Sequence, residues 1–353
     1  GKFVVFDTPP GNGAHFFTIS IRPTSRFAAA AGVAVPTLDH APAFFLERMR
    51  RPGLALAVSA TGAESEAPLH LLITAAAARS LFGKPLDSLT AGTLGGTIHG
   101  TVHLAEEARP TRNVIAILRG SDPALRGEYV AIGAHSDHIG TSDKPLDHDS
   151  VRAANEAAWE MRGKSLDNAA PEEPQRATIH VNVDSLRKLH SPRADSVFNG
   201  ADDDGSGTVS VLEIAQKFAS ERPRPKRSIL FVWHTGEELG LLGSRWFTDH
   251  PTVPRDSIVT QLNIDMIGRG SAQDILGGGP NFLQLIGSRR LSTELGDLAE
   301  KVNRTEEHPP FKFDYSLDRS GHPENIYCRS DHYMYARYGI PIIFFTTDRK
   351  SVV

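Results

Sequence analysis

Four short polar runs constrain the fold of this chain more than any other feature, because each is interpreted as the end of a strand. They carry imidazole and carboxylate side chains, and they are Gly133–His138, Asn199–Gly207, His234–Gly240 and Asn263–Gly268. In a parallel sheet the carboxyl ends of the strands lie along one edge, which is where ligands bind. The sequence therefore predicts that side chains from all four runs meet at one edge of a sheet.

The chain around these runs alternates between strand-like and helix-like segments, which predicts an α/β fold. Apolar residues of Val209–Phe218 recur at the spacing of a helix that packs on a sheet. The expected strands are Asn113–Leu118, Tyr129–Ile132, Ile229–Trp233, Val259–Ile264 and Ile340–Phe345, with a short helix at Leu239–Phe247. We expect a mainly parallel mixed sheet with helices on both faces.

Residues 1–95 show no catalytic spacing and predict a smaller accessory domain, joined through the glycine-rich stretch Thr90–Gly100 to a second domain over 96–353. The elements expected in the first domain are strands at Phe16–Ile21, Leu54–Val58 and Leu69–Thr74, and helices at Ala43–Arg51 and Ala75–Leu81. A polar insertion at about 141–198, with a helix expected at Val151–Met161, is far longer than the usual connection of about 4–6 residues. Two interpretations stay open, a solvated excursion and a flap over the site.

Composition excludes several classes of protein. The 353 residues suit two domains, and the net charge of -4 without a run of Lys and Arg argues against nucleic-acid binding. No stretch reaches the roughly 18 consecutive apolar residues of a membrane span. The single cysteine, Cys328, excludes an internal disulfide and a cysteine-cluster metal site.

The residue types in the four runs indicate a metal centre. Taken singly, His135 could be a core histidine, Asp202–Asp204 a solvated loop or a calcium site, and Glu237 and Glu238 the acidic first turn of a helix. Asp265, by contrast, ends an apolar strand, where an unpaired carboxylate is costly to bury. Zinc binds imidazole nitrogen and carboxylate oxygen, and two zinc ions need a bridging group such as an aspartate. Together the runs predict a two-zinc hydrolase.

This set of runs resembles the two-zinc aminopeptidase family, whose relatives include glutamate carboxypeptidase, glutaminyl cyclase and the transferrin receptor. The resemblance covers roughly Thr111 to Thr347, apart from the insertion. The ligands that it implies are His135 and Asp265 for one zinc ion, Asp203 as the bridge, and Glu238 for the second ion. It also implies that Glu237 is the general base and that Asp137 is the partner that orients His135.

One departure from the family pattern concerns the second zinc site. The family's last ligand is a histidine just beyond the strand that matches Ile340–Phe345, and this chain ends before it. By the resemblance, His332 lies near the pocket with Asp331 and Arg329 and is not a ligand. We therefore expect the second site to lack one protein ligand, the chain to be truncated at both ends, and the last hexapeptide, 348–353, to be unnatural.

The N-terminal part resembles a protease-associated domain through Gly1–Phe6 and the Leu69–Phe82 stretch. In the family such a domain shapes access to the site, and members that carry it are commonly exported. This resemblance implies an extracellular or periplasmic location. The insertion is the second departure from the family pattern, and it bears on substrate preference.

The sequence thus predicts a zinc-dependent exopeptidase acting on peptides, with an aminopeptidase as the first choice. Glu237 would take a proton from a water shared by the two metal ions and return it to the leaving amine. This truncated chain could itself be inactive.

Three alternatives remain. A carboxypeptidase or dipeptidase could use Arg329 or Arg269 to hold a carboxylate. Glutaminyl cyclisation is disfavoured, because that branch works with one zinc ion and this chain keeps both acidic ligand positions. A catalytically silent binding protein of the transferrin-receptor type is also disfavoured, because the visible ligands are intact.

Overall fold

The computed structural model describes residues 2–5, 29–36, 38–40, 56, 69–100, 107–161, 178–271, 278–306, 309–322 and 324–347. The chain divides into two compact units, Gly1–Arg109 and Pro110–Val353, whereas the sequence suggested a division at 95/96. Several predictions lie outside the described residues. They concern Phe16–Ile21, Ala43–Arg51, the last hexapeptide and, except for residue 56, Leu54–Val58.

The described part of the first unit is a small parallel sheet followed by a helix. Its strands lie in the order β1 (Phe3–Val5), β2 (Gly32–Val35) and β3 (Leu69–Leu72). Helix α2 (Ala75–Phe82) begins where the Thr74 hydroxyl accepts a hydrogen bond from the N–H of Ala77, at 3.0 Å, and ends at Gly83 in the left-handed conformation. The strand and helix expected over 69–81 are confirmed.

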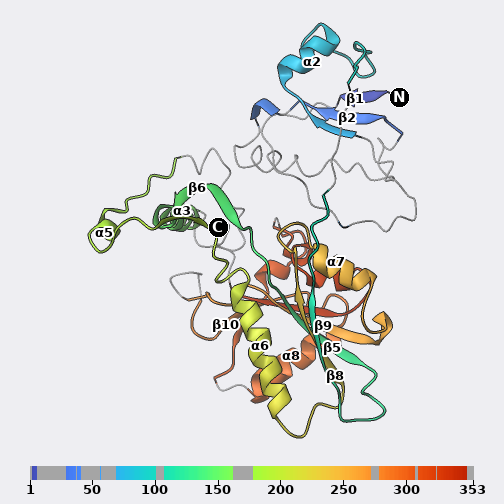
Figure 1. The fold of residues 1–353 in the computed structure, drawn as a ribbon, viewed down its shortest axis with the longest axis vertical. Coiled ribbons are helices and arrows are strands. Elements are labelled where there is room, and N and C mark those ends of the chain that lie inside the picture. Colours follow the sequence, from blue (N-terminus) through green and yellow to red (C-terminus); the bar gives the residue numbers. More distant parts are fainter. Residues whose placement is uncertain are drawn as a thin grey trace. The chain divides into compact units, whose positions relative to one another are not determined.

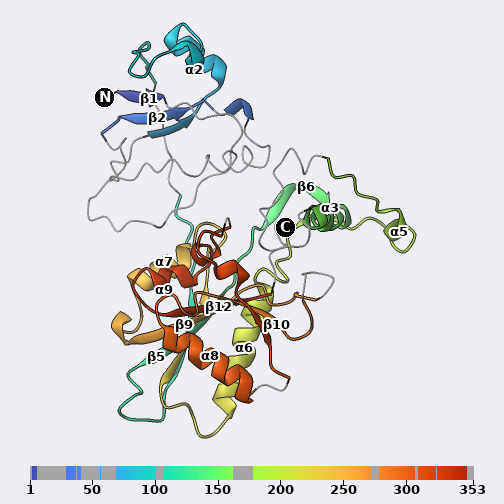
Figure 2. The same cartoon turned by 180° about the vertical axis from the view of Figure 1, so that it is seen from behind.

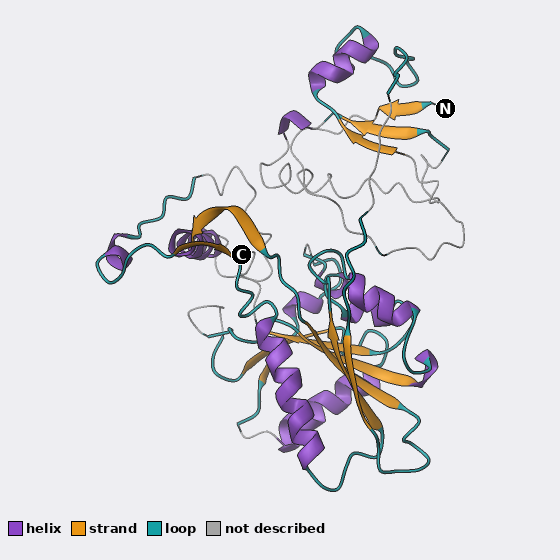
Figure 3. Ribbon diagram, in the orientation of Figure 1, coloured by secondary structure: helices purple, strands orange, loops and turns teal. Residues whose placement is uncertain are grey.

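A seven-stranded mixed sheet forms the centre of the second unit (Figures 1 and 3). In spatial order its strands are β11 (Lys312–Asp314), β10 (Phe282–Ile286), β12 (Ile342–Thr346), β9 (Ile258–Ile264), β5 (Tyr129–His135), β8 (Ser228–His234) and β4 (Val114–Leu118). Only the β10–β12 and β8–β4 pairs are antiparallel. The expectation of a mainly parallel sheet is confirmed.

Helices pack on both faces of this sheet, as predicted. Helix α6 (Gly205–Ser220) crosses one face, where Val211 packs among Ile132, Phe231 and Ile264 (Figure 1). Helices α7 (Leu242–Asp249) and α9 (His332–Ala336) lie on the opposite face, seen from behind in Figure 2, where Phe247, Tyr335 and Ala336 pack against the buried side chains of β5, β8 and β12. Helix α8 (Thr293–Glu306) completes the unit.

Some boundaries differ from those expected. Helix α7 begins three residues later than predicted, because residues 237–241 first form a turn in which the N–H groups of Gly240 and Leu241 both donate to the carbonyl of Glu237 at 2.9 Å. Leu241 adopts the left-handed conformation, with φ of 60°, immediately before the helix. Strands β10 and β11 and helix α8 were not predicted.

The insertion has its own secondary structure. Strand β6 (Thr141–Asp147) pairs antiparallel with β7 (Ala194–Val197), and helices α3 (His148–Met161) and α5 (Asp184–Arg187) lie between them in sequence. Asp149, which is 1% exposed, accepts hydrogen bonds from Arg187 at 2.7 Å and from Arg193 at 2.9 Å. The insertion is therefore a structure cross-linked by ion pairs. Among the described residues, no helix combines the length and apolar character that crossing a membrane requires.

Candidate metal centre and catalytic site

Three adjacent parallel strands deliver the polar runs to one edge of the sheet. Strand β5 ends at His135, β9 ends one residue before Asp265, and β8 ends three residues before Glu237. The fourth run brings Asp203 to the same place, because it lies directly before α6, which packs on β5 and β9. The order of the strands thus converts four distant segments into one cluster, as the sequence suggested.

The first group of candidate ligands surrounds the His135 imidazole. Its Nε2 atom lies 3.1 Å from an oxygen of Asp203 and 3.7 Å from an oxygen of Asp265. Burial lowers the pKa of His135, but the carboxylates of Asp203 and Asp265 outweigh this effect and raise the pKa well above its ordinary value. The three ligand atoms lie within 4.8 Å of one another, which is the spacing at which one cation can bind them all.

A second group shares Asp203 with the first. His138, Asp203 and Glu238 also present ligand atoms within 4.8 Å of one another. His138 Nδ1 lies 2.7 Å from Glu238 Oε1, and this contact raises the pKa of His138. The sequence analysis gave no role to His138, although it stands in the same polar run as His135.

Asp137 supports the site in a different way from the one expected. The Nδ1 atom of His135 lies 3.0 Å from the main-chain oxygen of Asp137 and 3.8 Å from its carboxylate. That carboxylate instead accepts hydrogen bonds from the N–H groups of Glu237 and Glu238, at 3.1 and 3.4 Å. Asp137 therefore orients His135 through its carbonyl group and holds the glutamate loop through its side chain.

Glu237 lies beside the first group without belonging to either group of ligands. Its Oε2 atom is 4.0 Å from His135 Nε2, and its side chain is 11% exposed. Burial raises the pKa of Glu237 well above its ordinary value, and the charges of Asp265 and Asp331 act in the same direction, against the effect of His135. A buried carboxyl of raised pKa beside a metal site has the properties of a general base.

Two supporting residues escaped the sequence analysis. The Asp204 carboxylate accepts hydrogen bonds from the N–H groups of His135, Gly207 and Met266, at 3.0, 3.0 and 3.1 Å, and so joins three segments of the site. The hydroxyl of Ser330 donates to Asp265 at 2.8 Å. Asp204 stands in the aspartate run and Ser330 directly precedes Asp331, but neither position reveals these contacts in the sequence.

The three residues expected near the pocket have separate surroundings. Asp331 is fully buried, and burial raises its pKa to about 7. His332 is also buried, where burial lowers its pKa to about 4, and its Nε2 atom bonds the carbonyl of Tyr327 at 2.8 Å. Arg329 is exposed and pairs with Glu324 at 3.2 Å. His332 belongs to neither group of ligands.

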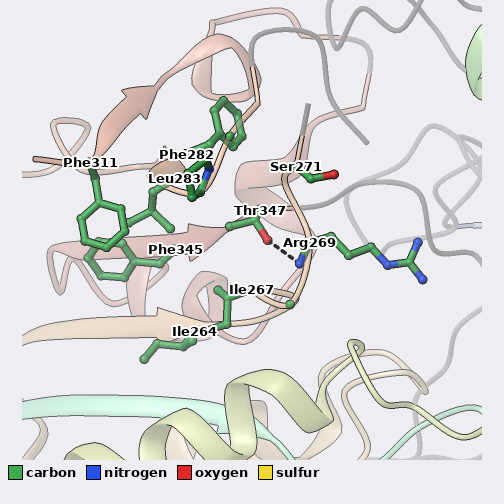
Figure 4. A pocket seen from close by; sticks show the side chains of 12 residues that line it. Ile264, Ile267, Arg269, Ser271, Phe282, Leu283, Phe311, Phe345 and Thr347 are labelled. Atoms are coloured by element: carbon green, nitrogen blue, oxygen red, sulfur yellow. Dashed lines mark hydrogen bonds between the residues drawn. The ribbon is translucent and has the colours of Figure 1, made fainter. Parts of the chain in front are cut away.

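A pocket of about 670 Å³ lies next to the end of β9 (Figure 4). Ile264, Leu283 and Phe345 form part of its apolar lining, and Phe311 lies against Phe345. The side chain of Arg269 extends away from these aromatic rings, while its N–H donates to the Thr347 hydroxyl at 3.1 Å. The candidate ligands, Asp331, His332 and Arg329 do not line this pocket.

The donor atoms of both groups fit zinc. His135 Nε2 and Asp265 Oδ1 in the first group, and His138 Nδ1 and Glu238 Oε1 in the second, are buried atoms without a hydrogen bond. Buried polar atoms normally have a partner, so four such atoms converging at two points indicate sites for a bound cation. One imidazole nitrogen with two carboxylates is a donor set typical of catalytic zinc, which keeps a further position open.

Comparison with known proteins adds a family assignment. The model of peptidase family M28 matches residues 113–352, a segment that contains every candidate ligand. Leupeptin-inactivating enzyme 1 of Streptomyces exfoliatus is 40% identical over 77 residues, which cover 21% of this chain and 18% of that protein. Leucine aminopeptidase 1 of Coccidioides posadasii (strain C735) is 45% identical over 74 residues, which cover 20% of this chain and 19% of that protein.

A solved structure, the zinc aminopeptidase BSAP from Bacillus subtilis, is also similar, at 20% identity and a TM-score of 0.37. The match covers 66% of this chain and 39% of that chain. In every one of these comparisons the matched segment is well under two thirds of the relative's own length. The family match spans more than half of the chain, and the chain therefore belongs to peptidase family M28.

Proposed function

We propose that this protein hydrolyses peptide bonds at a free amino terminus with zinc as its cofactor. One observation carries the proposal. The unpartnered donor atoms of His135 and Asp265 converge with Asp203, and the uncommitted carboxyl of Glu237 lies 4.0 Å from the same imidazole nitrogen. Metal-assisted hydrolysis requires at least a bound cation and an adjacent general base.

The residues divide the work between binding and proton transfer. His135, Asp203 and Asp265 would hold the zinc ion, which when bound acidifies water and polarises the scissile carbonyl. Glu237 accepts the proton of the attacking water and later donates it to the leaving amine. Asp137 keeps Glu237 in place through the bond to its N–H group.

The charge around the site favours an amino terminus over a carboxyl terminus. Acidic side chains surround His135, whereas the two arginines considered for a carboxylate already face acids. Arg329 pairs with Glu324 at 3.2 Å, and Arg269 lies 3.5 Å from Asp202. A substrate carboxylate would have to displace these partners, while a protonated amine would be attracted by the acidic cluster. The names of the relatives, among them a leucine aminopeptidase, support the same choice.

We further propose two zinc ions per active site. Among the described residues, Asp203 is the one that belongs to both groups of ligands, which places it to bridge two ions. Glu238 would contribute to the second ion. The intact acidic positions also support catalysis over a silent binding role of the transferrin-receptor type.

The Glu237→Gln variant tests the proposed mechanism. It removes the proton acceptor and keeps the shape of the side chain, so zinc content should stay at the wild-type level. Hydrolysis of a chromogenic leucine anilide should fall by about 10²–10⁴-fold. The matched control is Glu213→Gln, an exposed glutamate on α6, which should keep full activity. A Glu237→Gln protein with normal zinc and normal turnover would exclude this mechanism.

We also propose that the protein is exported and that residues 1–95 act as a protease-associated domain that shapes access to the site. The family resemblance of the N-terminal part supports this location. Fractionation of the source cells tests it directly, because finding the protein only in the cytosol would exclude export.

A further inference from the structure

We infer that His138 is a protein ligand of the second zinc ion and completes a His138–Asp203–Glu238 site. This inference rests on the proposed function, because it concerns the same metal centre. The family pattern assigns the nitrogen ligand of this ion to a histidine beyond β12. In this chain, His138, three residues after His135, presents a ring nitrogen within 4.8 Å of ligand atoms of Asp203 and Glu238.

The contact between His138 and Glu238 is arranged as a pair of ligands. His138 Nδ1 and Glu238 Oε1 approach to 2.7 Å, yet neither atom has a hydrogen bond of acceptable geometry. An ordinary ion pair would direct the ring N–H at the carboxylate oxygen. Two unaligned donor atoms, with Asp203 within 4.8 Å of both, leave their lone pairs free to face one cation.

The backbone around His138 is built to hold its ring. Gly200, with φ of +62°, lies so close that a Cβ atom placed on it would come within 2.9 Å of both Cβ and Cγ of His138. Only glycine permits this approach, and Gly200 belongs to the same loop as Asp203. The loop that supplies the shared carboxylate therefore also packs against the imidazole.

Asp137 aligns the two sides of the second site. Its carboxylate accepts a hydrogen bond from the N–H group of Glu238 at 3.4 Å. Asp137, which directly precedes His138 in the chain, therefore fixes the backbone of Glu238, the other ligand. The main-chain oxygen of Asp137 also lies 3.0 Å from the Nδ1 atom of the His135 ring. The segment 135–138 thus serves both groups, with His135 turned to one ion and His138 to the other.

His332, a fully buried histidine of the same unit, has partners of its own. His332 bonds the carbonyl of Tyr327 through Nε2 and stacks on Phe344, with ring centroids 4.7 Å apart. His138 is therefore the donor that the described geometry offers.

Zinc counting by native mass spectrometry tests the inference on the 353-residue chain. Wild type should hold two ions, and His138→Ala should hold one. The affinity for the second ion, measured by competition with a chromophoric chelator, should fall by more than about 100-fold. Loss of a residue that merely supports a ligand costs about 10–100-fold, so the size of the effect separates the two roles.

Three further variants complete the test. His250→Ala removes an exposed histidine and should keep both ions. Asp265→Asn should lose the ion of the first group and keep the ion at His138. His138→Gln, which preserves side-chain bulk, replaces the alanine variant if circular dichroism shows that the latter is unfolded.

Two outcomes would overturn the inference without affecting the proposed function. In one, His138→Ala keeps both ions, with an affinity for the second ion within about 100-fold of wild type, a loss no larger than that caused by removing a supporting residue. In the other, wild type holds a single ion that Asp265→Asn removes. A folded wild-type chain with no zinc at all would instead contradict the proposed function itself.

Discussion

At the scale of single residues, Asp204 supports the site through hydrogen bonds to the backbone, whereas its neighbour Asp203 offers a ligand atom to both groups. The Asp204 carboxylate bonds the N–H groups of His135, Gly207 and Met266, which belong to three different segments. Asp204 also caps the N-terminus of α6, where a negative charge is favourable. Burial raises its pKa, while the N–H groups of Met266 and His135 act in the opposite direction. Its role is to fix the positions of the residues that bind metal.

We predict that Asp204→Asn weakens zinc binding without removing a ligand. The amide replaces one acceptor oxygen by a donor, so at least one buried N–H loses its bond, at a cost of about 1–3 kcal/mol in the free energy of unfolding. Zinc affinity should drop by about 10–100-fold, as for other residues that orient ligands. Chelator competition and urea unfolding measure the two effects. Unchanged zinc affinity in a destabilised protein would show that the hydrogen bonds of Asp204 serve folding alone.

The residues nearest the strand ends could be placed from the sequence, whereas His138 could not. His135 and Asp265 each stand at the end of an apolar strand, so sheet topology alone brings them together. His138 lies beyond the strand, and its approach to Asp203 depends on how the loop after the insertion closes. Such loop closure depends on tertiary contacts, among them the close approach of Gly200 to His138. A local sequence pattern does not predict contacts of this kind.

At the scale of elements, the buried apolar strands β5, β8 and β9 could be predicted from the sequence, whereas the polar strand β6 of the same length could not. Strands β5, β8 and β9 are buried runs whose predicted bounds need only small changes. Strand β6 (Thr141–Asp147) contains Pro145 and three charged residues, and it lacks the alternation of a half-buried strand. It forms by pairing with β7, about fifty residues later, and by the ion pairs around Asp149.

We predict that Asp149→Asn loosens the insertion and leaves the central sheet unchanged. Arg193 and Arg187 lower the pKa of Asp149 from 3.8 to about 2. Because the folded value is the lower one, the ionised carboxylate stabilises the fold above pH 3.8, and this contribution disappears as the pH falls toward 2. At neutral pH, amide hydrogen exchange should therefore rise over 141–161 and 178–197 in the variant but stay constant in β5, β8 and β9.

The control for this prediction is Asp184→Asn, an exposed aspartate in the same insertion, which should exchange like wild type. The difference in amide hydrogen exchange of the insertion between Asp149→Asn and wild type, corrected for the intrinsic exchange rate, should become smaller as the pH falls from about 4 to about 2. Equal protection of the insertion in both proteins at pH 7 would show that the ion pairs of Asp149 contribute nothing to its order.

At the scale of the whole molecule, every candidate ligand and each of the three apolar clusters lies in the unit Pro110–Val353. The clusters draw on both faces of the central sheet and contain no described residue of the first unit. A unit of roughly 240 residues buries enough surface to fold alone. We therefore predict that residues 110–353, expressed without the first unit, bind zinc with the affinity of the full chain.

Chelator competition and thermal unfolding of the two proteins check this prediction. Equal zinc affinity and a thermal midpoint within a few degrees would assign metal binding and folding to the second unit alone. The first unit would then act only on the substrate, so peptide length preference could change between the two proteins while zinc binding does not. A fragment that folds but binds zinc more than about tenfold more weakly would mean that the first unit helps to build the metal centre, since tenfold corresponds to about 1.4 kcal/mol of lost binding free energy.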